Sequence, residues 1–297
     1  MPLNSSIVGT IGDSLTSDVD ARWTMAYAAA LGDTVPRYFN TLDPNGIVAH
    51  PLFPVCFEWP VIVAMRKMFD RTGLTPAEAS RGVHASHDLT IHRPIRPPER
   101  LRTWATVVGI EQRKPGAYQL TRLDTVDEHE RPLCTSWYGS IYRDVRVEGP
   151  NNILETPPVA PMPPSGHSQA VTESTISVAA GLAHTYTECA RIFNPIHTDA
   201  AVAHAAGLPS IILHGTATLA RAVSKVIAIE AKNDPACVIR IAGRFAAMVT
   251  MPSQIILRVC GREHVGDRHR IFFEVINDRG ATAIRDGLVV LGNGASE

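Results

Sequence analysis

Residues 186–218, YTECARIFNPIHTDAAVAHAAGLPSIILHGTAT, form the most informative segment of this chain. Within it, the turn-prone pair Asn194-Pro195 leads to His197, and a short helix is predicted directly afterwards, over Asp199–Ala206. Asp199 suits the N-cap or the first turn of that helix, because a carboxylate there interacts favourably with the helix dipole. We therefore expect His197 to be held on a rigid frame.

The second notable feature is Gly215, which precedes a longer predicted helix, Thr216–Ala231. Its backbone N–H is expected to point outward from the helix start, where the helix dipole stabilises a developing negative charge. Glycine also lets a carbonyl group approach the backbone closely. An imidazole such as that of His197 suits proton transfer near neutral pH. Asn194 can orient that imidazole or a water, or it can serve only as a turn residue.

Outward from this stretch, each half of the chain repeats one order of predicted elements. In the first half we predict a helix containing Trp23, Tyr27 and Ala30, capped by Thr16-Ser17-Asp18 and ending at Gly32, and a longer helix over Trp59–Arg71 with Pro60 near its start. The predicted strands are 84–91, 102–110, 118–127 and 133–142 in the first half, and 172–178, 238–242, 254–260, 270–276 and 282–291 in the second. This pattern indicates an α+β fold.

A proline-rich segment, GPNNILETPPVAPMPPSG at 149–166, divides the two halves. Its prolines, glycines and Asn-Asn pair are typical of a semi-rigid linker rather than of a helix or strand. We therefore predict an N-terminal domain over 1–148 and a C-terminal domain over 167–297. Both lengths are ordinary for a single domain.

Composition excludes several classes of function. The formal net charge is −1 and charges of both signs are interspersed, so we expect no nucleic-acid partner. No apolar run is long enough to span a membrane. The N-terminal MPLNSSIVGTIGDSL does not resemble a secretory signal and GNGASE is not a peroxisomal tripeptide, so we expect a cytoplasmic protein. The five cysteines show no CxxC pair and are expected to be small buried hydrophobes rather than zinc ligands.

The segment 186–218 resembles the hydratase signature of the MaoC-like family, the (R)-specific enoyl-CoA hydratases. That signature runs from an aromatic residue through Gly-Asp-x-Asn-Pro-aliphatic-His to a small residue, with a His-Gly pair later at the start of the long helix. The matching residues here are Tyr186, Asn194, Pro195, Ile196, His197, Ala203, His214 and Gly215. The resemblance implies a tandem (double) hotdog fold, in which each half is a long helix wrapped by a curved antiparallel sheet.

The chain departs from the family signature at its catalytic aspartate. Ile192 stands at that position and Arg191 at the preceding glycine. The first half shows the reverse, because Asp33 keeps the carboxylate while Tyr38 stands at the place of the histidine. His50 is the expected counterpart of His214. Asp33 is read as a turn or cap residue rather than as a partner of His197.

The resemblance implies His197, Asn194 and Gly215 as catalytic residues, the last through its N–H group, and Ile192, Phe193, His214 and Arg244 as candidates for substrate binding. His214 is expected to have a structural role, and Arg244 resembles a family arginine near the pantetheine or phosphate end of the ligand. Glu188 could replace the missing carboxylate, although a solvated glutamate is the simpler interpretation. The cluster Arg93, Arg96, Arg100 and Arg102 could contact a CoA phosphate or a partner, although an exposed loop face is the simpler interpretation. His84, His87 and His92 alternate as in a strand and are not interpreted as a metal site, since no cysteine accompanies them. His204 is interpreted as a surface or packing residue.

Three functions stay open. The first is a hydro-lyase acting on an enoyl- or 3-hydroxyacyl-thioester of CoA or acyl-carrier protein, with altered water activation. The second is an isomerase, cyclase or thioesterase in which His197 is the sole acid and base and Ile192 and Phe193 line a drier pocket. The third is a non-catalytic acyl-thioester-binding subunit. We expect no cofactor and no metal, and a homodimer is compatible with such a fold.

Overall fold

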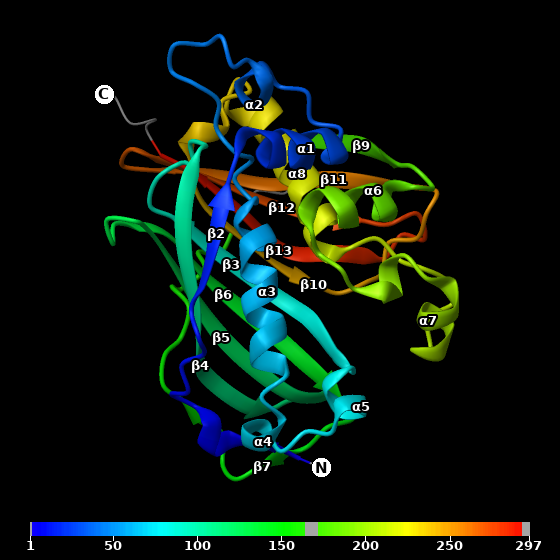
Figure 1. The fold of residues 1–297 in the computed structure, drawn as a ribbon. Helices are drawn as coiled ribbons and strands as arrows, with labels where there is room; N and C mark the ends of the chain where they lie inside the picture. The colour runs from blue at the N-terminus through cyan, green and yellow to red at the C-terminus, as the bar shows by residue number, and fades with distance from the viewer. Residues whose placement is uncertain (1, 164–171, 293–297) are drawn as a thin grey trace.

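The computed structural model describes residues 2–163 and 172–292. Its first half contains the longer helices α1 and α3 and the long strands β3 to β6 (Figure 1). The elements of this half are β1 Leu3–Asn4, η1 Ser5–Ile7, β2 Leu15–Val19, α1 Ala21–Leu31, α2 Pro36–Phe39, α3 Pro54–Arg66, α4 Phe69–Thr72, α5 Pro76–Ala79, β3 Gly82–Ile91, β4 Glu99–Gln112, β5 Gly116–Asp127, β6 Pro132–Arg143, β7 Val147–Glu148 and β8 Asn152–Ile153.

The second half repeats the order of helices followed by antiparallel strands. Its elements are β9 Thr172–Val178, α6 Leu182–Ala190, η2 Pro195–His197, α7 Ala200–Ala205, α8 Gly215–Glu230, η3 Pro235–Cys237, β10 Val238–Phe245, β11 Ser253–Val265, β12 Arg268–Ile276 and β13 Thr282–Leu291. The predicted strands 172–178 and 282–291 and the Asp199 N-cap of α7 are confirmed, and the other predicted strands are found with longer bounds. Residues 293–297, including most of GNGASE, lie outside the described part of the chain.

The two halves share one antiparallel sheet of order β2-β4-β5-β6-β3-β10-β13-β12-β11-β9. Strands β3 and β10 join the halves, in a register that pairs Thr90 with Arg240 and His87 with Gly243. Figure 1 shows α3 across the first-half strands, and it shows α1 and α6, which pack together, beside α8. This arrangement is the predicted α+β architecture, with one long helix in each half.

The predicted cap of α1 is wrong. Thr16, Ser17 and Asp18 belong to β2, which pairs with β4, and the N-cap is Asp20, whose carboxylate accepts a hydrogen bond from the Trp23 N–H at 2.7 Å. The predicted end is confirmed, because Gly32 adopts a left-handed conformation with φ of 72° and its N–H bonds back to the helix.

The long helix of the first half begins earlier than predicted. Pro54, and not Pro60, occupies its first turn, where a missing N–H costs nothing. Pro60 lies inside α3 on an exposed position, and the helix ends at Arg66 rather than at Arg71. Two shorter helices, α4 and α5, follow it.

The segment 149–166 is more ordered than a simple linker over its described part. Residues 152–153 form β8, which pairs with β4, and the Pro158 carbonyl accepts a hydrogen bond from Arg240 at 2.7 Å. Residues 164–166, together with the predicted start of the second domain, lie outside the described residues. The connection therefore follows the sheet surface across the β3–β10 seam, to which Arg240 belongs.

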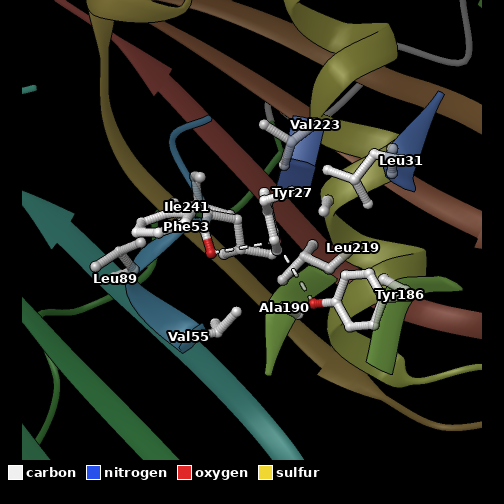
Figure 2. Packing of buried hydrophobic residues seen from close by; sticks show 14 of the residues in the cluster. Tyr27, Leu31, Phe53, Val55, Leu89, Tyr186, Ala190, Leu219, Val223 and Ile241 are labelled. Carbon is white, nitrogen blue, oxygen red and sulfur yellow. Dashed lines mark hydrogen bonds between the residues drawn. The ribbon is translucent and has the colours of Figure 1, made fainter. Parts of the chain in front are cut away.

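The main hydrophobic core spans both halves. Tyr27 of α1 and Tyr186 of α6 are fully buried, and their hydroxyl oxygens lie 3.5 Å apart (Figure 2). Around them pack Phe53, Leu219 and Val223. Cys56 and Cys134 are buried as predicted, whereas Cys189, Cys237 and Cys260 are partly exposed, and all five are free thiols.

Candidate active site

His197 is fixed by the backbone that precedes α8. Its Nδ1 lies 2.8 Å from the Ile212 carbonyl oxygen, so Nδ1 carries the proton and Nε2 keeps its lone pair. The imidazole stacks on the ring of His214, with 3.7 Å between ring centroids. Burial lowers the pKa of His197 to about 4, so the ring is neutral at pH 7. A neutral imidazole with a free Nε2 is suited to accept a proton.

His214 provides the ring on which His197 stacks. It is 2% exposed, and Nε2 lies 3.1 Å from the Thr187 hydroxyl oxygen of α6. Burial, together with the adjacent His197, lowers the pKa of His214 well below its usual range. This placement fits the predicted structural role, because a buried neutral ring cannot readily exchange protons with solvent.

Gly215 is the first residue of α8 and directly follows His214. Its N–H belongs to the first turn, where helix N–H groups have no partner within the helix. A Cβ added at this position would lie 2.8 Å from Cδ1 of Phe245 on β10, so the site has no room for a side chain. The stacking of His197 on His214 therefore brings the imidazole beside the start of α8, as the sequence predicted.

Tyr186 and Thr216 connect α6 to the same helix start. The Tyr186 hydroxyl donates to the Thr216 Oγ1 at 3.0 Å, and its ring lies 4.9 Å from that of His214. The sequence indicated the aromatic residue at 186 through the motif. It gave no signal for the Ile212 carbonyl or the Thr187 hydroxyl, because both act through backbone position or a common side chain.

The position of the lost aspartate is apolar. Ile192 is 5% exposed and packs in the main core. Arg191 keeps the left-handed conformation of the glycine that it replaces, with φ of 58°, and its guanidinium lies 3.9 Å from the centre of the Trp23 ring. This cation–π contact gives the arginine a structural role.

Phe193 and Asn194 directly precede the turn that carries His197. The Asn194 side chain is partly buried and makes no capping hydrogen bond, while the Asn194 backbone carbonyl oxygen accepts a hydrogen bond from the His197 N–H at 3.1 Å. The side-chain amide of Asn194 therefore makes no capping contact of the kind expected from a turn residue. Phe193 is 60% exposed, so it can contact a ligand only at the surface.

In the first half, the residues that correspond to the candidate site, His50 and Asp33, are buried in the interior. The fully buried His50 accepts from the Leu52 N–H through Nδ1 and reaches the Ser224 hydroxyl of α8 through Nε2 at 3.1 Å. Asp33 accepts from the Val35 N–H, as its reading as a turn residue predicts. The cavity beside His50 has a volume of about 20 Å³, which is room for a single water.

Most of the other candidates are engaged elsewhere or face solvent. Arg244 is exposed and pairs with Asp286 at 3.2 Å, and Glu188 is exposed on α6. His204 is exposed on α7.

The four arginines of the cluster all have partners within the protein. Arg93 pairs with Glu99 and Asp127, Arg96 bonds to the Asn45 carbonyl, and Arg100 and Arg102 pair with Asp18 and Glu130. His92 lies on the surface, whereas His84 and His87 are partly and fully buried on β3.

Among the described residues, no three histidine, cysteine, aspartate or glutamate side chains are grouped so that they could hold a metal ion. No helix in the same residues combines the length and apolar character required to cross a membrane.

Comparison with known proteins gives a family match for each half of the chain. Residues 166–279, which include His197, Gly215 and most of the second-half sheet, match the family described as MaoC like domain. Residues 6–136 match the FAS1-like, dehydratase domain region. Residues 166–279 thus form a MaoC-like dehydratase domain, in a chain whose first half matches a dehydratase region as well. The family predicted from the signature residues is thereby confirmed, despite isoleucine at the aspartate position.

Individual relatives of this MaoC-like chain are distant. Enoyl-CoA hydratase 2, peroxisomal, of Arabidopsis thaliana is 36% identical over 85 residues, which are 26% of this chain and 28% of the relative. A MaoC-like dehydratase from Phytophthora capsici superposes with a TM-score of 0.79 at 20% identity, covering 95% of this chain and 96% of the other. A double hotdog protein from Mycobacterium tuberculosis superposes with a TM-score of 0.61 at 15% identity, covering 96% of both chains. The predicted double hotdog fold is confirmed.

Proposed function

We propose that this MaoC-like chain is a hydro-lyase that adds water to an α,β-unsaturated acyl thioester or removes it from the 3-hydroxyacyl form. Family membership supports a hydratase or dehydratase type of activity. The observation that carries the proposal is the position of His197, whose Nδ1–H is held by the Ile212 carbonyl while its ring stacks beside the start of α8. In this proposal, the imidazole is the proton acceptor and the start of α8 stabilises the thioester carbonyl of the same substrate.

In the proposed hydration, the thioester carbonyl oxygen accepts a hydrogen bond from the Gly215 N–H. His197 Nε2 takes a proton from a water molecule as the water oxygen bonds to the β-carbon. The π electrons move toward the carbonyl, and the resulting enolate oxygen is stabilised by the Gly215 N–H and the dipole of α8. The imidazolium then returns its proton to the α-carbon, so the product contains one added water and His197 is neutral again.

Asn194 is proposed to hold the attacking water in place of the lost aspartate. Its partly buried amide is adjacent in sequence to the η2 turn that carries His197 and makes no capping bond there. An amide can orient water but cannot accept its proton, so His197 performs all proton transfers in this scheme. His214 supports the imidazole. The exposed Phe193 and Arg244 are proposed to contact the CoA or carrier-protein part of the substrate.

The reaction requires no resident cofactor, because CoA or a carrier protein enters as part of the substrate. Ile192 packs in the main hydrophobic core, so it is not available to line the drier pocket expected for an isomerase or cyclase. A cytoplasmic location, a homodimer and the absence of a nucleic-acid partner remain predictions from sequence. The Arabidopsis relative is named as peroxisomal.

The test is a hydration assay with trans-2-enoyl-CoA, followed by loss of enoyl-thioester absorbance and by product mass. His197→Ala is expected to lower kcat/KM by about 10²–10⁴-fold, the usual contribution of a positioned acid–base group. His204→Ala, which removes an exposed histidine seven residues later, serves as the matched control and should leave the rate unchanged. A product of unchanged mass would favour isomerisation, and full activity in His197→Ala would overturn the proposal.

A further inference from the structure

A second group of polar side chains is buried between α3 and the sheet, beyond the candidate active site. The described residues leave ten buried side-chain nitrogen or oxygen atoms without a hydrogen-bond partner, and five of these belong to four neighbouring residues. The five atoms are Glu58 Oε2, Arg66 Nε, His84 Nε2, His87 Nδ1 and His87 Nε2. We call these four residues and Tyr138 the α3 polar cluster. Such a concentration requires an explanation, since buried polar groups nearly always have partners.

The cluster is continuous. His84 stacks on Tyr138 with 3.8 Å between ring centroids and lies 5.4 Å from His87, while Arg66 donates to the Tyr138 hydroxyl at 3.2 Å. Glu58 accepts a hydrogen bond from the Ser136 hydroxyl on β6 and is 1% exposed, as is His87. The unpartnered atoms therefore lie on the sheet face that α3 covers.

Phe245 connects this cluster to the proposed thioester site. One part of its ring closes on Gly215, where a Cβ would be 2.8 Å away, and the ring centroid lies 4.6 Å from that of His84. In the sheet, His87 is paired with Gly243, two residues before Phe245. Contacts therefore run from Gly215 through Phe245 to His84, and from His84 through Tyr138 to Arg66.

The charges of the cluster favour an anion. Arg66 forms no ion pair with a carboxylate of the described residues, and its Nε is buried. Burial lowers the pKa of His87 to about 4 and that of His84 well below its usual range, so both rings are neutral near pH 7. Burial also raises the pKa of Glu58 to about 7, which reduces its negative charge. The half-buried Arg66 guanidinium, which lies over the Trp59 ring and has no carboxylate partner among the described residues, can still bind a carboxylate, which accepts several hydrogen bonds.

We propose that the acyl group of the substrate carries a second carboxylate at the end remote from the thioester, and that the α3 polar cluster binds it through Arg66, with His84 and Tyr138 as supporting contacts. This inference rests on the proposed function, because it gives the substrate class of the same site. It also accounts for unpartnered polar groups at a place where an aliphatic acyl chain would be bound by apolar residues.

The test compares two trans-2-enoyl-CoAs of equal chain length, one ending in a methyl group and the other in a carboxylate. The measured quantity is the ratio of their kcat/KM values. We expect the wild-type ratio to favour the carboxylate, and Arg66→Met to lower it by about 10–100-fold, as for the loss of hydrogen bonds to a charged group. Arg66→Lys should restore part of the ratio. Arg100→Met, which removes an exposed arginine on β4, is the control that should leave it unchanged.

Binding separates failure of this inference from failure of the proposed function. Calorimetric titration of His197→Ala protein with both thioesters, with and without Arg66→Met, measures charge preference without turnover. A preference for the carboxylate that depends on Arg66 supports the inference even if neither compound is hydrated. Equal affinity for both thioesters, or a ratio that Arg66→Met leaves unchanged, would overturn it and assign the unpartnered atoms to buried water.

Discussion

At the scale of single residues, the stacked pair His197 and His214 determines the chemistry available to the site. The Ile212 carbonyl holds the proton on Nδ1 of His197, and Thr187 holds the second ring behind it. Neither ring has a carboxylate partner among the described residues that would raise its basicity. The proposed reaction therefore relies on the position of His197, and not on a carboxylate partner, to make the imidazole an effective base.

The pKa of His197 predicts the acid limb of the pH–rate profile. Protonation of Nε2 below about pH 4 removes the lone pair, so kcat/KM should fall as pH decreases through that value and be constant from about pH 5 to neutrality. The measurement is kcat/KM for enoyl-thioester hydration as a function of pH. A fall in kcat/KM centred near pH 6.5, the ordinary pKa of a histidine, would mean that the imidazole is solvated in the working enzyme.

The residues of the site could be predicted in part. His197 and Gly215 were recognisable because their spacing from Asn194 and from the long helix is retained in the sequence. The Ile212 carbonyl that fixes the tautomer was not, because any residue has a carbonyl group. The α3 polar cluster also escaped prediction, since Glu58 and Arg66 lie on a helix whose start was misplaced, and the pairing of His87 with Gly243 is set by the sheet.

At the scale of elements, the start of α8 is shaped by its contact with β10. Gly215 has Phe245 against it, so the helix can approach the strand only because this residue lacks a side chain. The same Phe245 ring also contacts His84 of the α3 polar cluster.

Gly215→Ala should therefore damage both stability and catalysis. The added methyl group would overlap the Phe245 ring and displace either the ring or the helix start, with a loss of about 1–3 kcal/mol in the free energy of unfolding. Because the N–H would move with the helix, kcat should fall as well. Chemical denaturation and hydration kinetics measure the two effects. The double variant Gly215→Ala/Phe245→Leu should recover stability, and an unchanged single variant would show that this contact is loose.

The strands were easier to predict than the helices. Alternation of side chains made the four long strands of the first half and those of the second half visible in the sequence. The helix α6 was missed because Gly181 at its N-cap provides no side-chain cap, and the start of α3 was missed because Pro60 resembles a first-turn proline. Thr16-Ser17-Asp18 resembled a cap but forms an edge strand through its pairing with β4, which is a tertiary contact.

At the scale of the whole molecule, the two hotdog halves form one cooperative unit. The sheet continues through β3 and β10, and the main core contains residues of both halves. Arg240 on β10 reaches across the seam to Asp88 on β3 through two hydrogen bonds of 2.9 and 2.6 Å, with both side chains largely buried. The proline-rich connection adds its Pro158 carbonyl to the same guanidinium.

Arg240→Met should lower the free energy of unfolding by about 3 kcal/mol, because it leaves the Asp88 carboxylate buried without a partner. Arg244→Met provides a control on the same strand, since its pair with Asp286 is exposed and should contribute less than about 1 kcal/mol. Denaturant unfolding followed by tryptophan fluorescence should give a single transition in each case. Separate transitions for the two halves would show that the seam does not couple them.

His197 and the Gly215 N–H are proposed to act on one acyl thioester. The most direct measurement is a crystal structure of the His197→Ala protein with a bound trans-2-enoyl-CoA. The thioester carbonyl oxygen should accept a hydrogen bond from the Gly215 nitrogen at about 2.9 Å, with the β-carbon facing the space left by the imidazole. A thioester bound with its carbonyl away from α8, or with its β-carbon turned from residue 197, would contradict the account.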